Sequence, residues 1–399
     1  MIRGLARAAL VLALVVPSGP LVARLLGQGP AVLGLHVVAT LAAVLLAERW
    51  LAPLVEERLS LARARALAGA LLAVVGLAFL LVFPLADRGS FGGGSDADEA
   101  YDLGVRALAE GRSPYGERTY LGNLVHPLPG GLLLAWPLVS VFGTSAGQSL
   151  VWLVVYLGVL ALELGDLRRA LPLLVLLLAA CPAILHAVVT GTDGVMNPVS
   201  VLAGLAGLVG AWGRSGSGVA LRAGSAGLFA LALANRPNFL LALVPAFAAL
   251  AWRRGLARAA AAVSATLVLV GLLTVPLYLH DPAGFAPLEA ANRLTRLAGV
   301  VPYPAWVLPG AAAILSVVLA CRPSARTTVG AAASVALGQA LLVGTGHVVM
   351  SVRAGTLEPS YAGYGLFVLL PGALAAWAWL RRPAWPWARR SWWEPVTWS

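Results

Sequence analysis

Residues 66–84 have the sequence ALAGALLAVVGLAFLLVFP, an apolar run without a single charged side chain. About 20 such residues cross the hydrocarbon core of a bilayer as an α-helix, so this stretch predicts a transmembrane helix. The rest of the 399-residue chain has the same character, since 60% of its residues are apolar, 11% are charged and its mean hydropathy is +0.86. The composition predicts an all-α polytopic membrane protein of about 12 spans. It excludes a soluble enzyme, a disulfide scaffold and a disordered chain.

Apolar runs bounded by Arg, Gly or Pro mark the predicted spans. They lie at 5–26, 30–50, 66–84, 148–166, 170–190, 195–212, 222–235, 238–252, 259–279, 303–320, 327–349 and 361–380. The short runs at 222–235 and 238–252 meet at Asn235-Arg236-Pro237-Asn238, which predicts a hairpin of half-length or tilted helices. One further apolar run, 128–143, is shorter and is interrupted by proline.

The arginines decide whether 128–143 crosses the membrane. All 28 basic residues are arginine, and the net charge is +11. If 128–143 does not cross, nine arginines lie on one side: Arg24, Arg88, Arg106, Arg112, Arg118, Arg236, Arg293, Arg296 and Arg353. The other arginines then share the opposite side with both termini, as expected of cytoplasmic loops. We therefore expect a cell-membrane protein with cytoplasmic termini, an interfacial or re-entrant segment at 128–143, and a basic charge that does not imply nucleic-acid binding.

Residues 85–127 form the largest predicted external segment and carry seven of the 17 acidic residues. Apolar side chains recur at helical spacing from Tyr101 to Ala109, which predicts a short amphipathic helix on the membrane face. Asp98 fits the N-cap of this helix, and Gly111 fits the position after its last turn. The Asp98 carboxylate has two interpretations, a helix cap or a general base that takes a proton from a hydroxyl nucleophile.

Several short motifs of this chain resemble those of GT-C glycosyltransferases, which are polytopic enzymes that use polyprenyl-phosphate sugars. The group with bacterial mannosyltransferases, glycosyltransferase family 87, is the most similar. The motifs are the acidic pair before Tyr101, Gly111 to Tyr115, Tyr120, His126-Pro127, Gly191-Thr192-Asp193-Gly194, Asn235-Arg236-Pro237-Asn238 and Pro359-Ser360-Tyr361. The chain departs from the family pattern at His126-Pro127-Leu128-Pro129, where Pro-Pro is usual. The spacing from Asp98 to Tyr115 is about one residue short, which leaves Asp96 as a rival for the catalytic position.

The resemblance implies a GT-C-like core at 66–380, with the catalytic loop at 85–127 and the interfacial segment at 128–143. The two spans in 1–65 are then an N-terminal addition without an assigned role, and 381–399 is a Trp- and Arg-rich cytoplasmic tail. The implied reaction transfers a sugar, with mannose expected, from a polyprenyl-phosphate donor to a lipid or glycan acceptor outside the membrane. A single base and a direct displacement would invert the anomeric centre.

Such a transfer needs a base and a cation. The base is Asp98, or Asp96 in its place. For the donor phosphate, Arg236 is the first candidate because it interrupts two apolar half-helices, and Arg293 and Arg296 are further candidates. The expected substrate-binding residues are Tyr101, Tyr115, His126, Asp193 and Tyr361. No cofactor is expected, and the histidine spacing predicts no metal site.

A lipid or glycolipid translocase without catalytic activity is the alternative. It would bury ionisable residues at mid-membrane and pair broken helices in two related halves. Only Glu163 and Asp166 approach the first pattern, and no internal repeat is visible. A structural membrane subunit is a third possibility, but it would not need an acidic external loop.

Overall fold

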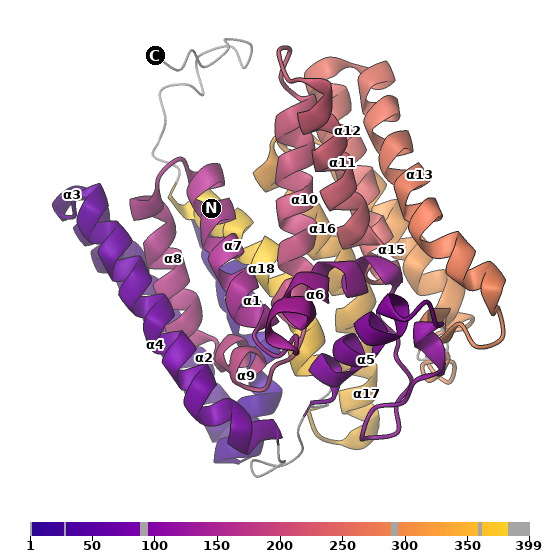
Figure 1. The fold of residues 1–399 in the computed structure, drawn as a ribbon. Helices are drawn as coiled ribbons and strands as arrows, with labels where there is room; N and C mark the ends of the chain where they lie inside the picture. The colour runs from indigo at the N-terminus through magenta and orange to yellow at the C-terminus, as the bar shows by residue number, and fades with distance from the viewer. Residues whose placement is uncertain (1, 28, 88–94, 289–293, 358–360, 382–399) are drawn as a thin grey trace.

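The computed structural model describes residues 2–27, 29–87, 95–288, 294–357 and 361–381. Within these ranges the chain folds into α-helices with short 3-10 and π-helical turns, and it forms no strand (Figure 1). The α-helices are α1 (Ile2–Leu26), α2 (Pro30–Leu46), α3 (Ala52–Arg58), α4 (Leu61–Asp87), α5 (Ala97–Ala109), α6 (Pro129–Phe142), α7 (Gln148–Leu164), α8 (Leu167–Ala180), α9 (Pro182–Val189), α10 (Met196–Trp212), α11 (Val219–Leu233), α12 (Leu243–Arg254), α13 (Leu256–His280), α15 (Pro304–Ala320), α16 (Thr328–Gln339), α17 (Thr345–Ala354) and α18 (Tyr361–Leu380).

Among the described residues, six helical segments are long and apolar enough to cross a membrane. They are Arg3–Leu26, Pro30–Arg58, Leu61–Asp87, Leu256–His280, Thr328–Ala354 and Gly363–Leu380. A seventh results if α8 and α9 form one span, although the two bend by 82° at their junction. Pro182 begins α9, and proline disfavours helical backbone in the residue before it, here Cys181. The prediction of an all-α membrane protein is confirmed.

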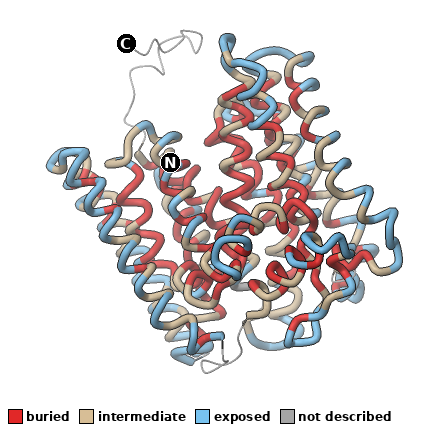
Figure 2. The backbone as a smooth tube through the Cα atoms, viewed as in Figure 1, coloured by how far each residue is buried: buried red, intermediate tan, exposed pale blue. Residues whose placement is uncertain are grey.

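The outer faces of the bundle are apolar and exposed, as a lipid-facing surface requires. In α4, Leu77, Leu80 and Leu81 lie on one face and are all exposed, whereas Val75 faces the interior. Figure 2 shows the contrast between exposed outer helices and a buried interior. Such a surface is stable in a bilayer and not in water.

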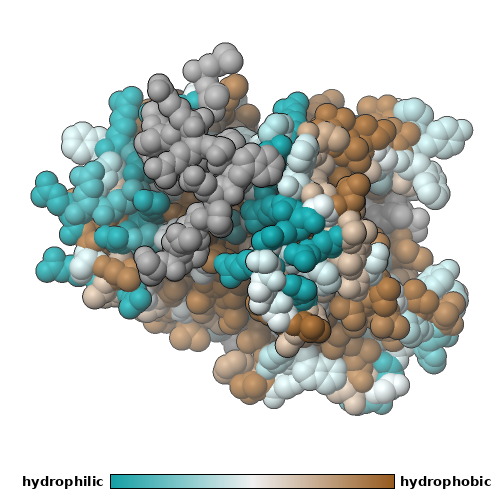
Figure 3. Space-filling view, turned by 90° about the horizontal axis from the view of Figure 1, so that it is seen from above, coloured by the Kyte–Doolittle hydropathy of each residue, from teal (hydrophilic) through white to brown (hydrophobic). Residues whose placement is uncertain are grey.

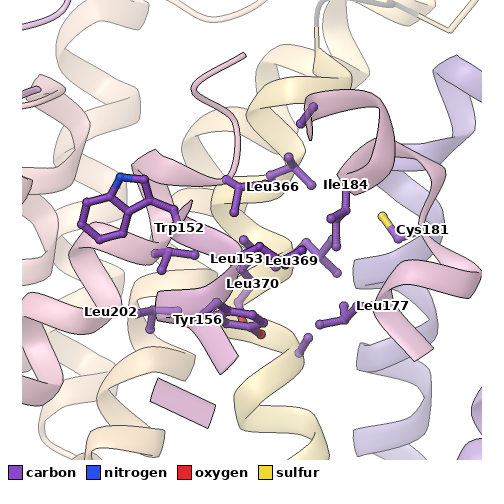
Figure 4. Packing of buried hydrophobic residues seen from close by; sticks show 14 of the residues in the cluster. Trp152, Leu153, Tyr156, Leu177, Cys181, Ile184, Leu202, Leu366, Leu369 and Leu370 are labelled. Atoms are coloured by element: carbon purple, nitrogen blue, oxygen red, sulfur yellow. The ribbon is translucent and has the colours of Figure 1, made fainter. Parts of the chain in front are cut away.

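The interior is a close-packed apolar core to which α7, α8, α9, α10 and α18 all contribute (Figure 4). Tyr156 of α7 lies fully inside it, and its hydroxyl donates to the Leu370 carbonyl of α18 at 2.9 Å. The hydroxyl is therefore satisfied, so the ring is buried without an unpaired polar group. This core joins the two ends of the chain to its centre.

Four segments that are distant in sequence meet at one end of the bundle. Arg7 of α1 pairs with Glu48 at 2.6 Å, and Arg381 after α18 pairs with Glu56 of α3 at 2.7 Å. The Trp377 indole donates to the Arg169 carbonyl of α8 at 3.3 Å. The arginine distribution requires these segments to share one side, and the contacts agree with it. Which side of the membrane they face stays a prediction.

Both ends of α6 lie against α5. Leu132 in its first turns fills the space above Gly104, where a Cβ atom would meet Leu132 Cδ2 at 2.7 Å. After its last turn, the Gly143 carbonyl accepts from Arg106 Nη2 at 2.8 Å. A helix that contacts one short helix at both of its ends lies alongside that helix. This arrangement supports the prediction that 128–143 does not cross.

The first helix, α1, packs against the core. Pro17 of α1 packs so closely on Gly365 of α18 that a Cβ atom there would lie 2.8 Å from the proline ring. Ser18 of the same helix lies 3.1 Å from the Cys181 sulfur at the α8–α9 bend. Because α1 touches both of these helices, it can contribute to any site that they form.

Candidate functional site

A cavity of about 440 Å³ lies at the end of the bundle opposite the Arg7 and Arg381 ion pairs. It is lined by the end of α1, the start of α5, the segment before α6, the turn after α9, the α11–α12 break and the start of α18. Its ionisable lining residues are Arg24, Asp96, Tyr101, His126, His186, Asp193, Arg236 and Tyr364. Five of these were predicted from sequence as site residues, and the fold brings them together from segments far apart in the chain.

Tyr101 is the centre of a buried hydrogen-bond network. Its hydroxyl lies 3.1 Å from Asp193 Oδ2 and 3.0 Å from Asn235 Oδ1. The Asn235 amide nitrogen donates to Asn197 Oδ1 at 2.6 Å, which fixes the orientation of that side chain. A tyrosine has one hydroxyl hydrogen, so only one of the two oxygens can receive it at a time. The other oxygen keeps an acceptor position directed at the Tyr101 hydroxyl.

Arg236 forms an ion pair with Asp193 in the cavity wall. Arg236 Nη2 donates to Asp193 Oδ2, and both side chains are largely buried. Burial by itself would raise the pKa of Asp193, but Arg236, Asn197 and Tyr101 together hold it below its usual range. Asp193 is therefore a carboxylate. Among the described residues, Arg236 Nε has no hydrogen-bond partner, so the guanidinium keeps a donor that the ion pair does not use.

The break that holds Arg236 has a local cause in the sequence. Pro237 follows directly, and Arg236 adopts the extended backbone that a residue before proline prefers. The carbonyls that the broken helix leaves free accept from the start of α6, Ala234 from Gly130 N at 2.7 Å and Asn235 from Leu128 N at 3.0 Å. Gly130 is required there, because a Cβ atom would overlap backbone carbonyls of α11. The predicted interruption at 235–238 is confirmed.

Gln339 of α16 holds the other side of this break. Asn238 Nδ2 donates to Gln339 Oε1 at 2.7 Å, and Gln339 Nε2 donates to the Asn238 carbonyl at 3.0 Å. Gln339 is fully buried, and a π-helical turn over Ala340–Gly344 follows it. The segment that carries Arg236 is thus fixed on two sides.

Asp96 lines the cavity, and two side chains orient its carboxylate. Asp96 Oδ2 accepts from Thr119 Oγ1 at 2.6 Å and from Asn123 Nδ2 at 2.7 Å. A tight turn brings both donors to it, with Gly122 in the left-handed region at φ +78°. Because α5 begins at Ala97, Asp96 occupies the N-cap position, two residues earlier than the predicted N-cap Asp98.

Asp98 lies elsewhere. It is within the first turn of α5 rather than at the N-cap, it is 7% exposed, and it does not line the cavity. Burial, and then the carboxylate of Asp102 one turn later, raise the pKa of Asp98 to about 7. Asp102 accepts from the Ser145 backbone N–H at 2.7 Å, and the Ser145 hydroxyl donates to the Asp98 carbonyl at 3.0 Å. Asp98 therefore belongs to the packing between α5 and the start of α7.

Tyr115 and Arg296 also lie away from the cavity. Tyr115 is buried, its ring packs edge-on against Phe285 with centroids 4.7 Å apart, and its hydroxyl has no partner among the described residues. Arg296 is exposed, and its carbonyl accepts from Arg353 Nη1 at 2.6 Å. In this geometry neither residue can touch a molecule held in the cavity.

Two predicted residues cannot be placed in the site. Arg293 lies outside the described residues. Tyr361 begins α18, and its side chain lies outside what the structure describes, although Gly363 and Tyr364 in the same turn line the cavity. No group of three or more His, Cys, Asp or Glu side chains in the described ranges could hold a metal ion.

Three ionisable residues of the cavity, Arg24, His186 and Tyr364, were not predicted as site residues. Arg24 ends α1, and the sequence interpretation gave this helix no role. His186 lies inside the apolar run 170–190. An ionisable residue in such a run costs free energy and indicates a site, which is the signal that could have identified His186.

Comparison of this chain with protein-family models, with curated proteins and with solved structures finds no match.

Proposed function

We propose that this protein is a GT-C-type membrane glycosyltransferase. It moves a sugar, with mannose the first to test, from a polyprenyl-phosphate donor to a lipid or glycan acceptor outside the membrane, with inversion. One observation carries the proposal: an oriented carboxylate, a buried Arg–Asp pair and a tyrosine line one cavity at the end of an apolar bundle. A lipid-linked sugar needs such a cavity, because its tail stays in the bilayer while the reacting carbon lies at the boundary.

In the proposed reaction the acceptor hydroxyl oxygen attacks the anomeric carbon on the face opposite the phosphate. The bond between that carbon and the phosphate oxygen breaks, and its electron pair leaves with the polyprenyl phosphate. The Asp96 carboxylate takes the hydroxyl proton, and Arg236 donates to the departing phosphate through the part of its guanidinium that lines the cavity.

Asp96 is the better base on geometry. A general base must come within hydrogen-bond reach of the proton that it takes. Asp96 lines the cavity and is held by Thr119 and Asn123, whereas Asp98 is buried between α5 and α7. The pKa of Asp98, about 7, also leaves it half-protonated at neutral pH. The role first assigned to Asp98 thus passes to its rival.

We propose further that twelve segments cross the membrane, with both termini cytoplasmic and the cavity outside. The segments are α1, α2 with α3, α4, α7, α8 with α9, α10, α11, α12, α13, α15, α16 with α17, and α18. Contacts among the ends of α1, α3, α8 and α18 support this topology. So does the packing of both ends of α6 against α5. Arginine-rich ends are retained in the cytoplasm.

The test is a transfer assay with the full-length protein in proteoliposomes. Radiolabelled polyprenyl-phosphate mannose, and in parallel the glucose and galactose donors, are supplied with a total lipid extract of the source membrane as acceptor. We expect one donor to give a labelled product. Asp96→Asn should lower the rate by about 10²–10⁴-fold, the usual contribution of a general base.

Glu110→Gln is the matched control, because Glu110 is an exposed acid beyond the far end of the same helix and should leave the rate unchanged. Movement of intact donor across the bilayer without a new glycosidic bond would contradict the proposal and favour a translocase.

A further inference from the structure

A second hollow lies between α12, α13 and α15 and shares no residue with the cavity. Its volume is about 740 Å³, and its walls are almost entirely apolar, with Phe247, Trp252, Leu267 and Val317 among them. Leu267 and Val317 are about half exposed on the outside of the bundle. The hollow is therefore an apolar groove that opens sideways towards the lipid.

Arginines gather at one end of this groove. The Trp252 indole donates to the Ala320 carbonyl at 3.3 Å, which ties the end of α12 to the end of α15. Arg254 and Arg322 each follow within two residues of that contact in the sequence, and Arg254 Nε donates to the Gly213 carbonyl at 2.7 Å. The Arg326 guanidinium stacks 4.4 Å from the centre of the Trp252 ring. The groove thus ends in a cluster of cations around a tryptophan.

Few acidic residues are available to neutralise the positive charge of this cluster. No acidic residue occurs in 194–280 or in 290–357, the two stretches that contain α10 to α13 and α15 to α17. Glu163 of α7 interacts with Arg253, the neighbour of Arg254. Figure 3 looks onto the end of the bundle at which α12 joins α13, where hydrophilic side chains gather between hydrophobic flanks. A lipid at this end of the groove meets an excess of positive charge.

We propose that the groove binds an anionic phospholipid of the surrounding bilayer. One acyl chain lies along α12 in the groove, and the phosphate lies at Arg254 and Arg322. Basic pockets between transmembrane helices recognise anionic head groups, and tryptophan is favoured at the same depth. A zwitterionic lipid would fill the groove equally well, but its quaternary ammonium offsets the charge of its phosphate, so it would gain less from the arginines. The proposal does not depend on the proposed function, because it involves the other end of the molecule.

The experiment measures which lipid the full-length protein keeps. The protein is reconstituted with equal amounts of phosphatidylglycerol and phosphatidylcholine, delipidated gently in detergent, and analysed by native mass spectrometry. We expect phosphatidylglycerol to be retained in clear excess, by about fivefold for each arginine that faces the head group. Arg254→Gln with Arg322→Gln should remove most of that excess. Arg63→Gln with Arg65→Gln, two exposed arginines at the start of α4, should keep it.

A second pair of variants tests the groove itself. Val317→Trp places an indole in the groove and should displace the retained lipid without lowering the thermal midpoint. Ile314→Trp, one turn earlier on the outer face of α15, should retain it.

Four results would overturn the proposal: equal retention of the two lipids by the wild type, unchanged retention in Val317→Trp, equal loss in the α4 control, or displacement of phosphatidylglycerol by added polyprenyl phosphate.

Discussion

Replacing Asp98 by asparagine should make the stability of the protein less sensitive to pH. Asparagine keeps the shape of the side chain and removes its ionisation. Burial and the Asp102 carboxylate raise the pKa of Asp98 to about 7 in the folded protein, against an ordinary value of 3.8. The folded state therefore keeps a proton that the unfolded chain loses. Protonated Asp98 contributes stability that is fully present below about pH 4 and is lost as pH rises to about 7.

The two pKa values set the size of this effect at about 4 kcal/mol in total, of which about 3 kcal/mol falls between pH 5 and pH 8. Unfolding of wild type and Asp98→Asn is followed in mixed micelles with increasing dodecyl sulfate at both pH values. The wild type should lose about 3 kcal/mol more than the variant over this interval. Titrating groups that do not interact with Asp98 contribute equally to both proteins and cancel in the difference.

Glu110→Gln controls for the removal of an acid as such, because Glu110 is exposed and its removal should give no pH-dependent difference. Equal pH dependence in wild type and Asp98→Asn would refute the argument, since Asp98 would then be ionised in the folded protein.

Three further predictions concern neighbouring residues. Arg236→Gln should destabilise the protein by about 3–5 kcal/mol in the same unfolding assay, because Asp193 would remain buried without its partner; adding Asp193→Asn should restore stability but not transfer activity. Gln339→Leu removes both hydrogen bonds to Asn238 and should lower the rate of transfer by about tenfold at an unchanged pH optimum. A lower stability with an unchanged rate would contradict a positioning role for Gln339. Tyr115→Phe deletes a buried hydroxyl without a partner and should leave both the rate and the unfolding free energy unchanged or slightly improved; a raised KM would instead place Tyr115 at the substrate.

Much of the fold follows from local sequence. The apolar runs predict most helices because a buried or lipid-facing backbone must satisfy its own hydrogen bonds, which a helix does within one segment. The break at 235–238 is also local, because proline restricts the residue before it. The bend at Cys181-Pro182 has the same signal, but the proline does not specify its angle of 82° or the contact that Ser18 of α1 makes with Cys181.

The catalytic base was harder to predict, because the residue at which α5 begins decides whether Asp96 or Asp98 lies at the cavity. The motif spacing does not decide whether Asp96 or Asp98 is the base. The residue at which a helix begins also differs by one or two between assignments. A start at Ala97 directs Asp96 to the cavity and Asp98 to the interior. The Thr119 and Asn123 donors that select Asp96 come from a turn that apolar periodicity does not reveal.

The contribution of α1 could not be derived from the sequence. In lipid the pairing of helices depends on close contacts of small residues, and not on apolar character that all spans share. The contact between Pro17 and Gly365 is of this kind, and it places Arg24 beside the start of α18. The composition of α1 does not distinguish a helix that packs against the core from one that lies at the edge of the bundle.

The most direct test compares the rates of sugar transfer by Asp96→Asn and Asp98→Asn in the same proteoliposomes, with the donor that the wild type accepts. We predict a loss of about 10²-fold or more for Asp96→Asn, and a rate within a few-fold of wild type for Asp98→Asn. Substantial activity in Asp96→Asn together with a dead Asp98→Asn would contradict the account, because the acid inside the packing, and not the acid in the cavity, would then be the base.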